Sequence, residues 1–295
     1  MLSVAVFPGI LINSLNKGRI SAARNKPGNY RIKISLNAYT FNNQLVGKQM
    51  SVDGLLEYAA SLNFDAIDLT AYYLPGYPNV PSTDIINRIK RKAFLLGLDI
   101  SGTGIRNDFT WPDIDERAKS FRLIEEWVPA AASLGAPVIR IFAGNNKNPD
   151  FSWEQTAEWM IDAFRKCAEM GKKYGVMIAL QNHADFIQTA DQFLWIREQV
   201  DSEWFGLMVD IGSFQEKNAY EETEVAAPYA ISWQIKDRLT LDGKLVETDV
   251  PRIINIIKKA GYRGYIPLEI IGEENPEERL ITLLKQVKLS LSSDS

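Results

Sequence analysis

The segment Gln181-Asn182-His183 carries the only histidine of the chain and stands at the end of a predicted strand, Met177–Asn182. An imidazole gains and loses a proton near neutral pH, which suits it to general acid/base chemistry. A lone histidine is often structural, but a place just beyond a strand end favours a functional role for His183. The amide of Gln181 offers an oxygen to a cation or a hydroxyl group, but it cannot take up a proton at neutral pH.

Polar side chains also gather at the ends of the other predicted strands. Side chains of an extended strand alternate between two faces, so Gln234 and Lys236 point to one side and Trp233 and Ile235 to the other. A ring of such polar groups is typical of an active site and not of a core. The residues in these positions are Asn37, Tyr39, Asp68, Arg106, Asn107, Asp108, Arg140, Gln181, Asn182, His183, Asp210, Gln234, Lys236, Asp237 and Glu269.

Eight short apolar segments alternate with longer amphipathic segments that predict helices. Segments this apolar are typical of strands buried on both faces, so we expect an α/β fold, a single closed (β/α)8 TIM barrel. A doubly wound open sheet is the alternative. Barrels of this kind place their chemistry at the carboxyl ends of the strands. The predicted strands are Ile32–Asn37, Ala66–Thr70, Leu98–Gly102, Val138–Ala143, Met177–Asn182, Phe205–Asp210, Ile231–Asp237 and Tyr265–Ile270.

Several predicted helices carry capping signals at their ends. Ser152 with Gln155, and Thr189 with Gln192, match the pattern of a capping box, in which the first and fourth residues cap each other's main chain. Gly135 follows a long amphipathic segment and is typical of the residue just past a helix end. These signals place helices between the strands, as a barrel requires.

The composition is that of an ordinary globular protein, with 295 residues, 46% of them hydrophobic, and a net charge of −4. No cluster of Lys and Arg suggests a nucleic-acid partner, and no stretch reaches transmembrane length, so no membrane partner is expected either. The single Cys167 excludes an intramolecular disulfide and a cysteine zinc cluster. The sequence lacks G-x-G-x-x-G and a P-loop lysine, and we therefore expect no nucleotide cofactor.

The first 30 residues differ from the rest of the chain. Leu2–Leu11 is apolar but interrupted by Pro8, and Ser14–Arg31 is polar and basic. Residues 1–30 are therefore predicted to be an N-terminal arm or the remnant of a secretory leader, and residues 31–295 the barrel domain. The two readings imply different locations, cytoplasmic for the arm and periplasmic for the leader, and both remain open here.

Six motifs follow one another along the chain: Phe64-Asp65-Ala66-Ile67-Asp68-Leu69, Leu134-Gly135-Ala136-Pro137-Val138-Ile139-Arg140, Leu180-Gln181-Asn182-His183, Val209-Asp210-Ile211-Gly212, Trp233-Gln234-Ile235-Lys236-Asp237, and Gly261-Tyr262-Arg263-Gly264-Tyr265 leading to Leu268-Glu269. Their order and spacing resemble the sugar phosphate isomerase/epimerase family, the xylose-isomerase-like TIM barrels. The resemblance runs from about Lys33 to Ile271. It implies a small-molecule sugar as partner and, since dimers are common in the family, a homodimer.

The resemblance also implies a divalent metal ion at the mouth of the barrel. Its ligand positions carry over to Gln181, Asp210, Gln234 and Glu269. Glutamine replaces the family's glutamate at the first position and its histidine at the third. The remaining donors are all oxygens, which suit Mn²⁺, Mg²⁺ or Ca²⁺ better than Zn²⁺. The alternative is that both glutamines bind sugar hydroxyl groups and no metal is present.

The implied reaction is isomerisation or epimerisation of a keto or aldo sugar, or a phosphorylated derivative, through proton abstraction next to a carbonyl. Gln181 cannot act as one of two paired glutamate bases, so Glu269 is the expected base and His183 its acid/base partner. Lys236 or a metal would stabilise the enediolate. Two alternatives are a lyase of the inosose-dehydratase type and a non-catalytic sugar-binding barrel. The residues expected to bind substrate are Asn37, Asn107, Arg140, Asn182 and Asp237.

Overall fold

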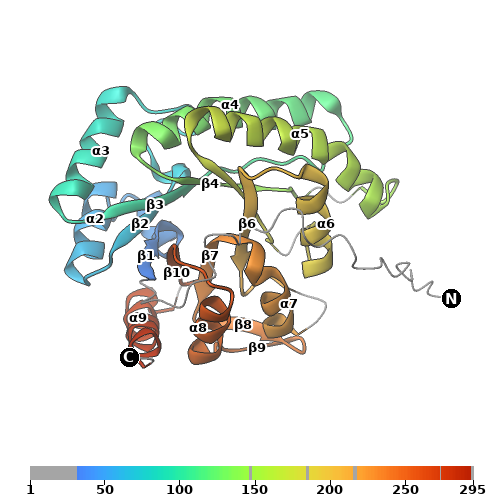
Figure 1. The fold of residues 1–295 in the computed structure, drawn as a ribbon. Coiled ribbons are helices and arrows are strands. Elements are labelled where there is room, and N and C mark those ends of the chain that lie inside the picture. Colours follow the sequence, from blue (N-terminus) through green and yellow to red (C-terminus); the bar gives the residue numbers. More distant parts are fainter. Residues whose placement is uncertain (1–31, 146–147, 184–185, 215–217, 273, 294–295) are drawn as a thin grey trace.

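The computed structural model describes residues 32–145, 148–183, 186–214, 218–272 and 274–293 (Figure 1). In this part of the chain, eight parallel strands close into a barrel in the order β1-β10-β7-β6-β5-β4-β3-β2. The predicted TIM barrel is confirmed, and the open sheet is wrong. The arm expected over residues 1–30 lies outside the described residues. The barrel strands are β1 (Lys33–Asn37), β2 (Ala66–Thr70), β3 (Asp99–Gly104), β4 (Val138–Phe142), β5 (Met177–Gln181), β6 (Phe205–Asp210), β7 (Ala230–Lys236) and β10 (Tyr265–Glu269).

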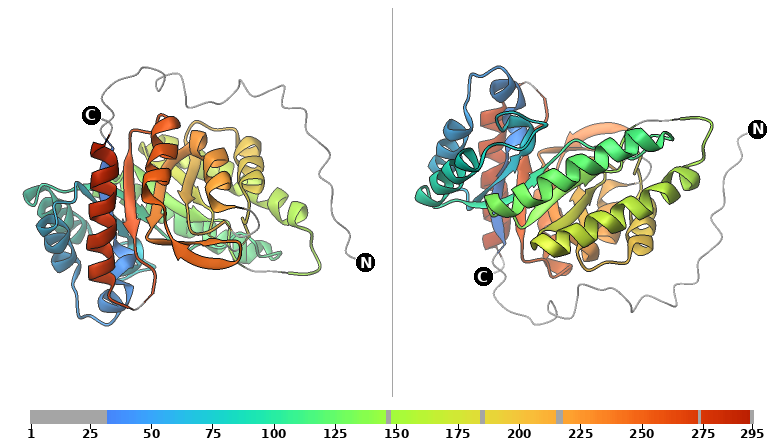
Figure 2. Two further views of the ribbon diagram at one scale, coloured as in Figure 1. Left: turned by 90° about the horizontal axis from the view of Figure 1, so that it is seen from below. Right: turned by 90° about the horizontal axis from the view of Figure 1, so that it is seen from above.

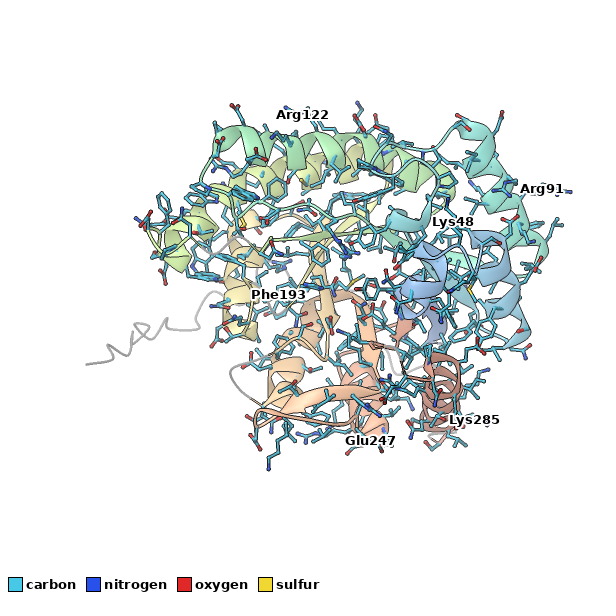
Figure 3. The ribbon with its side chains drawn as sticks, turned by 180° about the vertical axis from the view of Figure 1, so that it is seen from behind. Lys48, Arg91, Arg122, Phe193, Glu247 and Lys285 are labelled. Carbon is cyan, nitrogen blue, oxygen red and sulfur yellow. The ribbon has the colours of Figure 1, made fainter. Side chains whose placement is uncertain are left out.

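Helices cover the outside of the barrel, and α4 and α5 run side by side along one flank (Figures 1 and 2). Charged side chains such as Arg91, Arg122 and Lys285 project from the outer faces of these helices (Figure 3). Within the described residues, no helix is both long and apolar enough to cross a membrane. The helices are α1 (Asn42–Val46), α2 (Val52–Ser61), α3 (Thr83–Leu95), α4 (Ile114–Leu134), α5 (Trp153–Tyr174), α6 (Ala190–Val200), α7 (Ala219–Ala226), α8 (Val250–Lys259) and α9 (Pro276–Ser292), with short 3₁₀ turns at Ala38–Phe41, Ala71–Tyr73 and Ala227–Tyr229.

The predicted capping signals set the helix ends. Both capping boxes form, with Ser152 and Gln155 starting α5 and Thr189 and Gln192 starting α6. Each box satisfies two main-chain N–H groups that the helix itself leaves without a partner. At the other end of α4, Gly135 adopts a left-handed conformation with a φ of 84°, as expected of a residue that terminates a helix.

Alternation along the strands separates two apolar regions. On β5, Ile178 and Leu180 pack outward into the large core between barrel and helices. Ala179 lies in a second, smaller cluster with Val138 and Met208 of the neighbouring strands. Gln181 stands two residues beyond Ala179 and therefore shares its inward face. The small apolar cluster thus forms a floor beneath the polar groups at the strand ends.

A hairpin that the sequence analysis did not predict follows β7 directly. It consists of β8 (Arg238–Leu241) and β9 (Lys244–Glu247), paired antiparallel outside the barrel. Asp242 and Gly243 form its turn with φ values of 50° and 71°, the conformation that an Asp-Gly pair favours in a two-residue hairpin. The Asp-Gly pair was the signal in the sequence. The hairpin lies next to α7 and α8 in Figure 1 and leaves the barrel just after Lys236.

Candidate active site

A cavity of about 480 Å³ opens at the carboxyl ends of the barrel strands. This volume lies in the range of roughly 300–1,000 Å³ that is common for small-molecule sites. The described residues that line it are Asn37, Tyr39, Thr70, Tyr72, Arg106, Asn107, Asp108, Arg140, Phe142, Gly144, Asn145, Gln181, His183, Asp210, Gln234, Lys236, Glu269 and Ile271.

An ammonium group lies between two carboxylates at one side of this cavity. The Nζ atom of Lys236 is 2.7 Å from Asp210 Oδ2 and 3.6 Å from Glu269 Oε2. The side chain of Lys236 is only 12% exposed, and those of Asp210 and Glu269 are 0% and 4% exposed. The three residues end β7, β6 and β10, which are neighbours in the barrel, so strand order alone brings them together.

The carboxylate of Asp210 is fully occupied by hydrogen-bond donors. Its Oδ2 accepts bonds from Lys236 Nζ, from Gln181 Nε2 at 3.0 Å and from Ser213 Oγ at 2.8 Å. Its Oδ1 accepts the main-chain N–H of Gly212 at 3.0 Å. These donors come from three side chains and the main chain, and together they fix the position of the Asp210 carboxylate.

The two glutamines of the site bind each other. Gln181 Nε2 donates to Gln234 Oε1 at 2.6 Å as well as to Asp210. Both side chains are buried, and both face the cavity. The amide nitrogen of Gln181, and not its oxygen, is therefore directed toward the acidic centre.

Glu269 has the perturbed acidity expected of a proton acceptor. Burial is the main cause and raises the pKa of its carboxyl to about 7, and the negative charge of Asp210 adds to the rise. The positive charge of Lys236 opposes it. For Lys236 itself, burial would lower the pKa, but the two carboxylates outweigh burial and raise the pKa above its ordinary value. Lys236 therefore stays an ammonium while Glu269 can gain or lose a proton near neutral pH.

Two asparagines fasten neighbouring strand ends through their side-chain amides. Asn182 Nδ2 donates to the main-chain carbonyl of Asp210 at 3.0 Å, and its Oδ1 accepts the Asp210 N–H at 2.8 Å. Asn107 makes the same reciprocal pair with the main chain of Phe142, at 2.7 and 3.0 Å. Each amide is committed to main-chain groups, and the effect is to fix where the next strand ends.

An arginine and a histidine contact the ring of Phe142. The guanidinium of Arg140 lies 4.0 Å from the Phe142 ring centre, and the His183 ring centre lies 4.6 Å from it. Arg140 Nη1 also donates to the carbonyl of Ile105 at 2.5 Å. These contacts hold His183 at the exposed rim of the cavity on the side of β4 and β5.

Asp68 is buried in the middle of β2. Asn37 Nδ2 donates to its Oδ2 at 3.1 Å. Burial raises the pKa of the Asp68 carboxyl to about 6, although the charge of Arg140 and the hydrogen bond from Asn37 both lower it.

A model of the family described as "xylose isomerase-like TIM barrel" matches residues 56–288, most of the chain. The chain belongs to this family. The resemblance stated from the six motifs is thereby confirmed. No curated protein shows significant sequence similarity to the chain.

Solved structures of the same fold include several sugar epimerases. The 3-keto-D-glucoside 4-epimerase of E. coli superposes with a TM-score of 0.69 at 15% identity, covering 88% of this chain and 100% of that one. D-psicose 3-epimerase of Clostridium cellulolyticum, solved with D-tagatose, gives 0.71 at 17% identity over 88% and 99%. A xylose isomerase-like protein of Mycobacterium smegmatis, solved with magnesium, gives 0.67 at 18% identity over 90% and 100%. At these identities the likeness establishes the fold.

Most of the predicted site residues of this family member meet in the cavity. The expected catalytic residues Glu269, His183 and Lys236 all line it, as do the expected metal positions and Asn37, Asn107 and Arg140. Asn182 and Asp237 do not. Asn182 is fully buried against Asp210, and Asp237 turns away to form two bonds with Arg279, at 2.7 and 2.9 Å. Neither side chain is placed to contact a substrate in the cavity.

Some lining residues were not singled out from the sequence. Thr70, Phe142 and Ile271 stand at strand ends but look like core residues in a linear reading. Gly144 has a φ of 134°, and a Cβ there would lie 1.8 Å from Asp108 Oδ1, so only glycine fits beside this carboxylate. Phe142 could have been found from the sequence, because it stands two residues after Arg140 and side chains at this spacing share one face of a strand.

The four expected metal ligands converge, but their arrangement does not fit a divalent cation. Asp210 already accepts four hydrogen bonds, and Gln181 presents its amide nitrogen to the centre. The ammonium of Lys236 lies between the two carboxylates that a cation would need. Among the described residues, no group of three or more His, Cys, Asp and Glu side chains is arranged to hold a metal ion.

Proposed function

We propose that this protein is an enzyme that isomerises or epimerises a sugar, or a keto or phosphorylated sugar derivative, through proton abstraction next to a carbonyl group. The observation that carries the proposal is the Glu269 carboxyl, buried at the cavity wall with a pKa raised to about 7. A base works best when its pKa lies near the working pH. The family membership and the sugar epimerases among the structural neighbours support a sugar as the substrate.

In the proposed first step, a Glu269 oxygen takes the proton from the carbon next to the carbonyl. The electrons of that C–H bond form a C=C bond, and the carbonyl electrons move to oxygen to give an enediolate. Lys236 lies 3.6 Å from Glu269 and lines the same cavity, so its ammonium can donate a hydrogen bond to this oxygen. A fixed positive charge where negative charge develops lowers the barrier.

In the second step, a proton returns to carbon. Return to the opposite face of the same carbon gives an epimer, and return to the neighbouring carbon after a proton shift between the oxygens gives an isomer. Gln181 cannot deliver this proton, and we assign the delivery to His183, which lines the cavity from the end of β5. The scheme needs no step through a bound metal ion, because Lys236 supplies the positive charge.

The proposal is tested by following C–H exchange. A panel of ketopentoses, ketohexoses and 3-keto-glycosides is incubated with the protein in D₂O, and proton NMR measures both loss of the C–H signal and new products. The Glu269→Gln variant should lower exchange by about 10²–10⁴-fold, the usual contribution of a general base. Its thermal unfolding midpoint shows whether it is folded.

Glu278→Gln is the matched control, since it makes the same change on the exposed surface of α9. It should exchange at the wild-type rate. Exchange that survives Glu269→Gln at the wild-type rate would remove Glu269 as the base. A dehydrated product instead of a stereoisomer would assign the lyase reaction, and sugar binding without exchange would assign the non-catalytic barrel.

A further inference from the structure

A side chain of the protein already places a positive charge at the acidic centre of the cavity. Asp210 and Glu269 are almost completely buried, and two buried carboxylates need a cation close by. In a barrel mouth this cation could be a bound metal ion. Here the ammonium of Lys236 lies between the carboxylates, at 2.7 Å from one and 3.6 Å from the other.

We propose that Lys236 is a built-in cation that occupies the place of a divalent metal ion, so that this cavity binds the substrate's oxygen through an ammonium group. The proposal goes beyond the proposed function, because it concerns how the site is charged whether or not a sugar is turned over. It makes Lys236 at once the counter-ion of Asp210 and the hydrogen-bond donor for the substrate.

The hydrogen bonds around Asp210 support this reading. Four donors reach its two oxygens, from Lys236, Gln181, Ser213 and the main chain of Gly212. Coordination of a metal ion by Asp210 Oδ2 would require several of these bonds to break at once. Oδ2, the oxygen nearest to the ammonium, accepts three of these bonds and is therefore saturated by the protein's own donors.

The local backbone is shaped for the lysine. A Cβ atom at Gly212 would lie 2.7 Å from Lys236 Cδ and 3.5 Å from Lys236 Nζ. Gly212 therefore leaves room for the Lys236 side chain beside the turn after β6, and a larger residue there would make this flexible side chain shift.

The charge balance points the same way. Besides Lys236, the guanidinium of Arg140 and the ring of His183 act electrostatically on Glu269. Counting Asp68, which interacts with Arg140, a divalent ion added to Lys236 and Arg140 would place four positive charges near three buried carboxyl groups, which desolvation makes unfavourable. A metal ion could enter only by displacing the ammonium.

Metal binding in the absence of sugar tests the proposal. Full-length protein is treated with EDTA and dialysed, and Mn²⁺ binding is measured by loss of the free-ion EPR signal. Wild type should bind no Mn²⁺ at the mouth of the barrel up to about 1 mM. Any binding free energy would then be weaker than roughly 4 kcal/mol. Lys236→Met, which keeps the side-chain volume without the charge, should bind one Mn²⁺ at least about tenfold more tightly than wild type.

Further variants sharpen the result. Adding Gln181→Glu to Lys236→Met supplies a third carboxylate and should tighten Mn²⁺ binding again. Lys33→Met is the matched control, because it removes a lysine that pairs with Asp99 at the opposite end of the barrel, and it should bind no Mn²⁺.

The wild-type measurement decides the proposal even if Lys236→Met does not fold. Stoichiometric Mn²⁺ binding to wild type that Asp210→Asn abolishes would overturn it, as would a folded Lys236→Met that binds Mn²⁺ no better than wild type. The assay contains no sugar and measures no activity. Its result can therefore be interpreted even if the proposed reaction proves wrong.

Discussion

Asn182 and Asp210 are joined by two hydrogen bonds that run in opposite directions, from Asn182 Nδ2 to the Asp210 carbonyl and from the Asp210 N–H to Asn182 Oδ1. The asparagine is fully buried and stands between the strand end that carries Gln181 and the histidine of the cavity rim. It therefore fixes the end of β6, and with it the carboxylate on which Lys236 rests. Its role is to position a neighbour and not to contact a substrate.

The Asn182→Ala variant should lower the free energy of unfolding by about 1–3 kcal/mol, because it leaves the buried N–H of Asp210 without its partner and leaves the Asp210 carbonyl with only the weaker bond from the Ser213 N–H. Urea unfolding monitored by circular dichroism measures this. Asn79→Ala makes the same change at an exposed loop position and should shift the free energy by less than about 0.5 kcal/mol. Equal stability of the two variants would show that the Asn182 bonds contribute nothing.

Activity should depend on pH through Glu269. Its pKa is raised to about 7, and the ionised form is the base, so kcat/KM should rise about tenfold per pH unit below 7 and level off above it. Because the charge of Lys236 lowers the pKa of Glu269, Lys236→Met should move this inflection to higher pH. A pH profile of C–H exchange measures both. An inflection that Lys236→Met leaves in place would mean that another group titrates.

The strand ends were predictable from the sequence because parallel strands that are buried on both faces appear as short apolar segments. Gln181, Asp210 and Glu269 each end such a segment, and barrel closure then brings them to one rim. The ion pair of Lys236 with Asp210 was not predictable, because it depends on where a long side chain turns at Gly212. The alternation of side chains along a strand predicts the face on which a side chain lies, but it does not predict which group that side chain binds.

The roles of the polar loop residues were harder to predict for the same reason. Asn107 and Asn182 were expected to bind substrate because an amide at a strand end can serve sugar hydroxyls. Here both amides bind the main chain of the next strand. A linear sequence does not distinguish these uses, because they differ only in which neighbour lies within about 3 Å.

The stability of the fold should fall as pH rises through the titration of Asp68. Burial raises the folded-state pKa of this carboxyl from 3.8 to about 6, so the folded protein holds a proton that the unfolded chain releases earlier. Its contribution is full below pH 4 and is lost by about pH 6, a difference on the order of 3 kcal/mol. Urea unfolding at a series of pH values measures it.

Asp68→Asn should remove the part of this slope that Asp68 contributes, since an amide does not titrate, while the part contributed by Glu269, whose pKa is raised from 4.5 to about 7, should remain. Asp162→Asn is the control, because its side chain is 83% exposed and pairs only with the next turn of α5. It should leave the slope between pH 4 and 6 unchanged. A slope between pH 4 and 6 that is as steep in Asp68→Asn as in wild type would assign the whole effect to another buried group.

Arg106 should contribute to substrate binding and not to the chemical step. Its guanidinium lies 4.8 Å from the centre of the Tyr72 ring, which Arg140 also approaches at 5.4 Å, and both arginines line the cavity. Arg106→Ala should therefore raise KM about five- to tenfold with kcat nearly unchanged, and more for a phosphorylated or acidic sugar. Arg91→Ala, on the outside of α3, should change neither constant.

His183 should be needed for product formation but not for the first proton transfer. Its ring packs against Phe142 at the cavity rim, while Glu269 and Lys236 form the pair that starts the proposed reaction. His183→Asn should therefore still exchange the substrate C–H proton with D₂O, while product formation falls by about 10²–10⁴-fold. Glu269→Gln should lose both signals, so the two variants separate the two steps in one NMR experiment.

The Phe142→Leu variant controls for the position of the histidine. It keeps the imidazole but removes the ring that holds it, so product formation should fall less than in His183→Asn, and exchange should stay at the wild-type rate. If His183→Asn instead lost exchange and product formation together, His183 would act in the first step. The roles of the two residues would then be reversed, with His183 as the base and Glu269 as the proton donor. Equal product formation in wild type and His183→Asn would mean that another group in the cavity returns the proton to carbon in the second step.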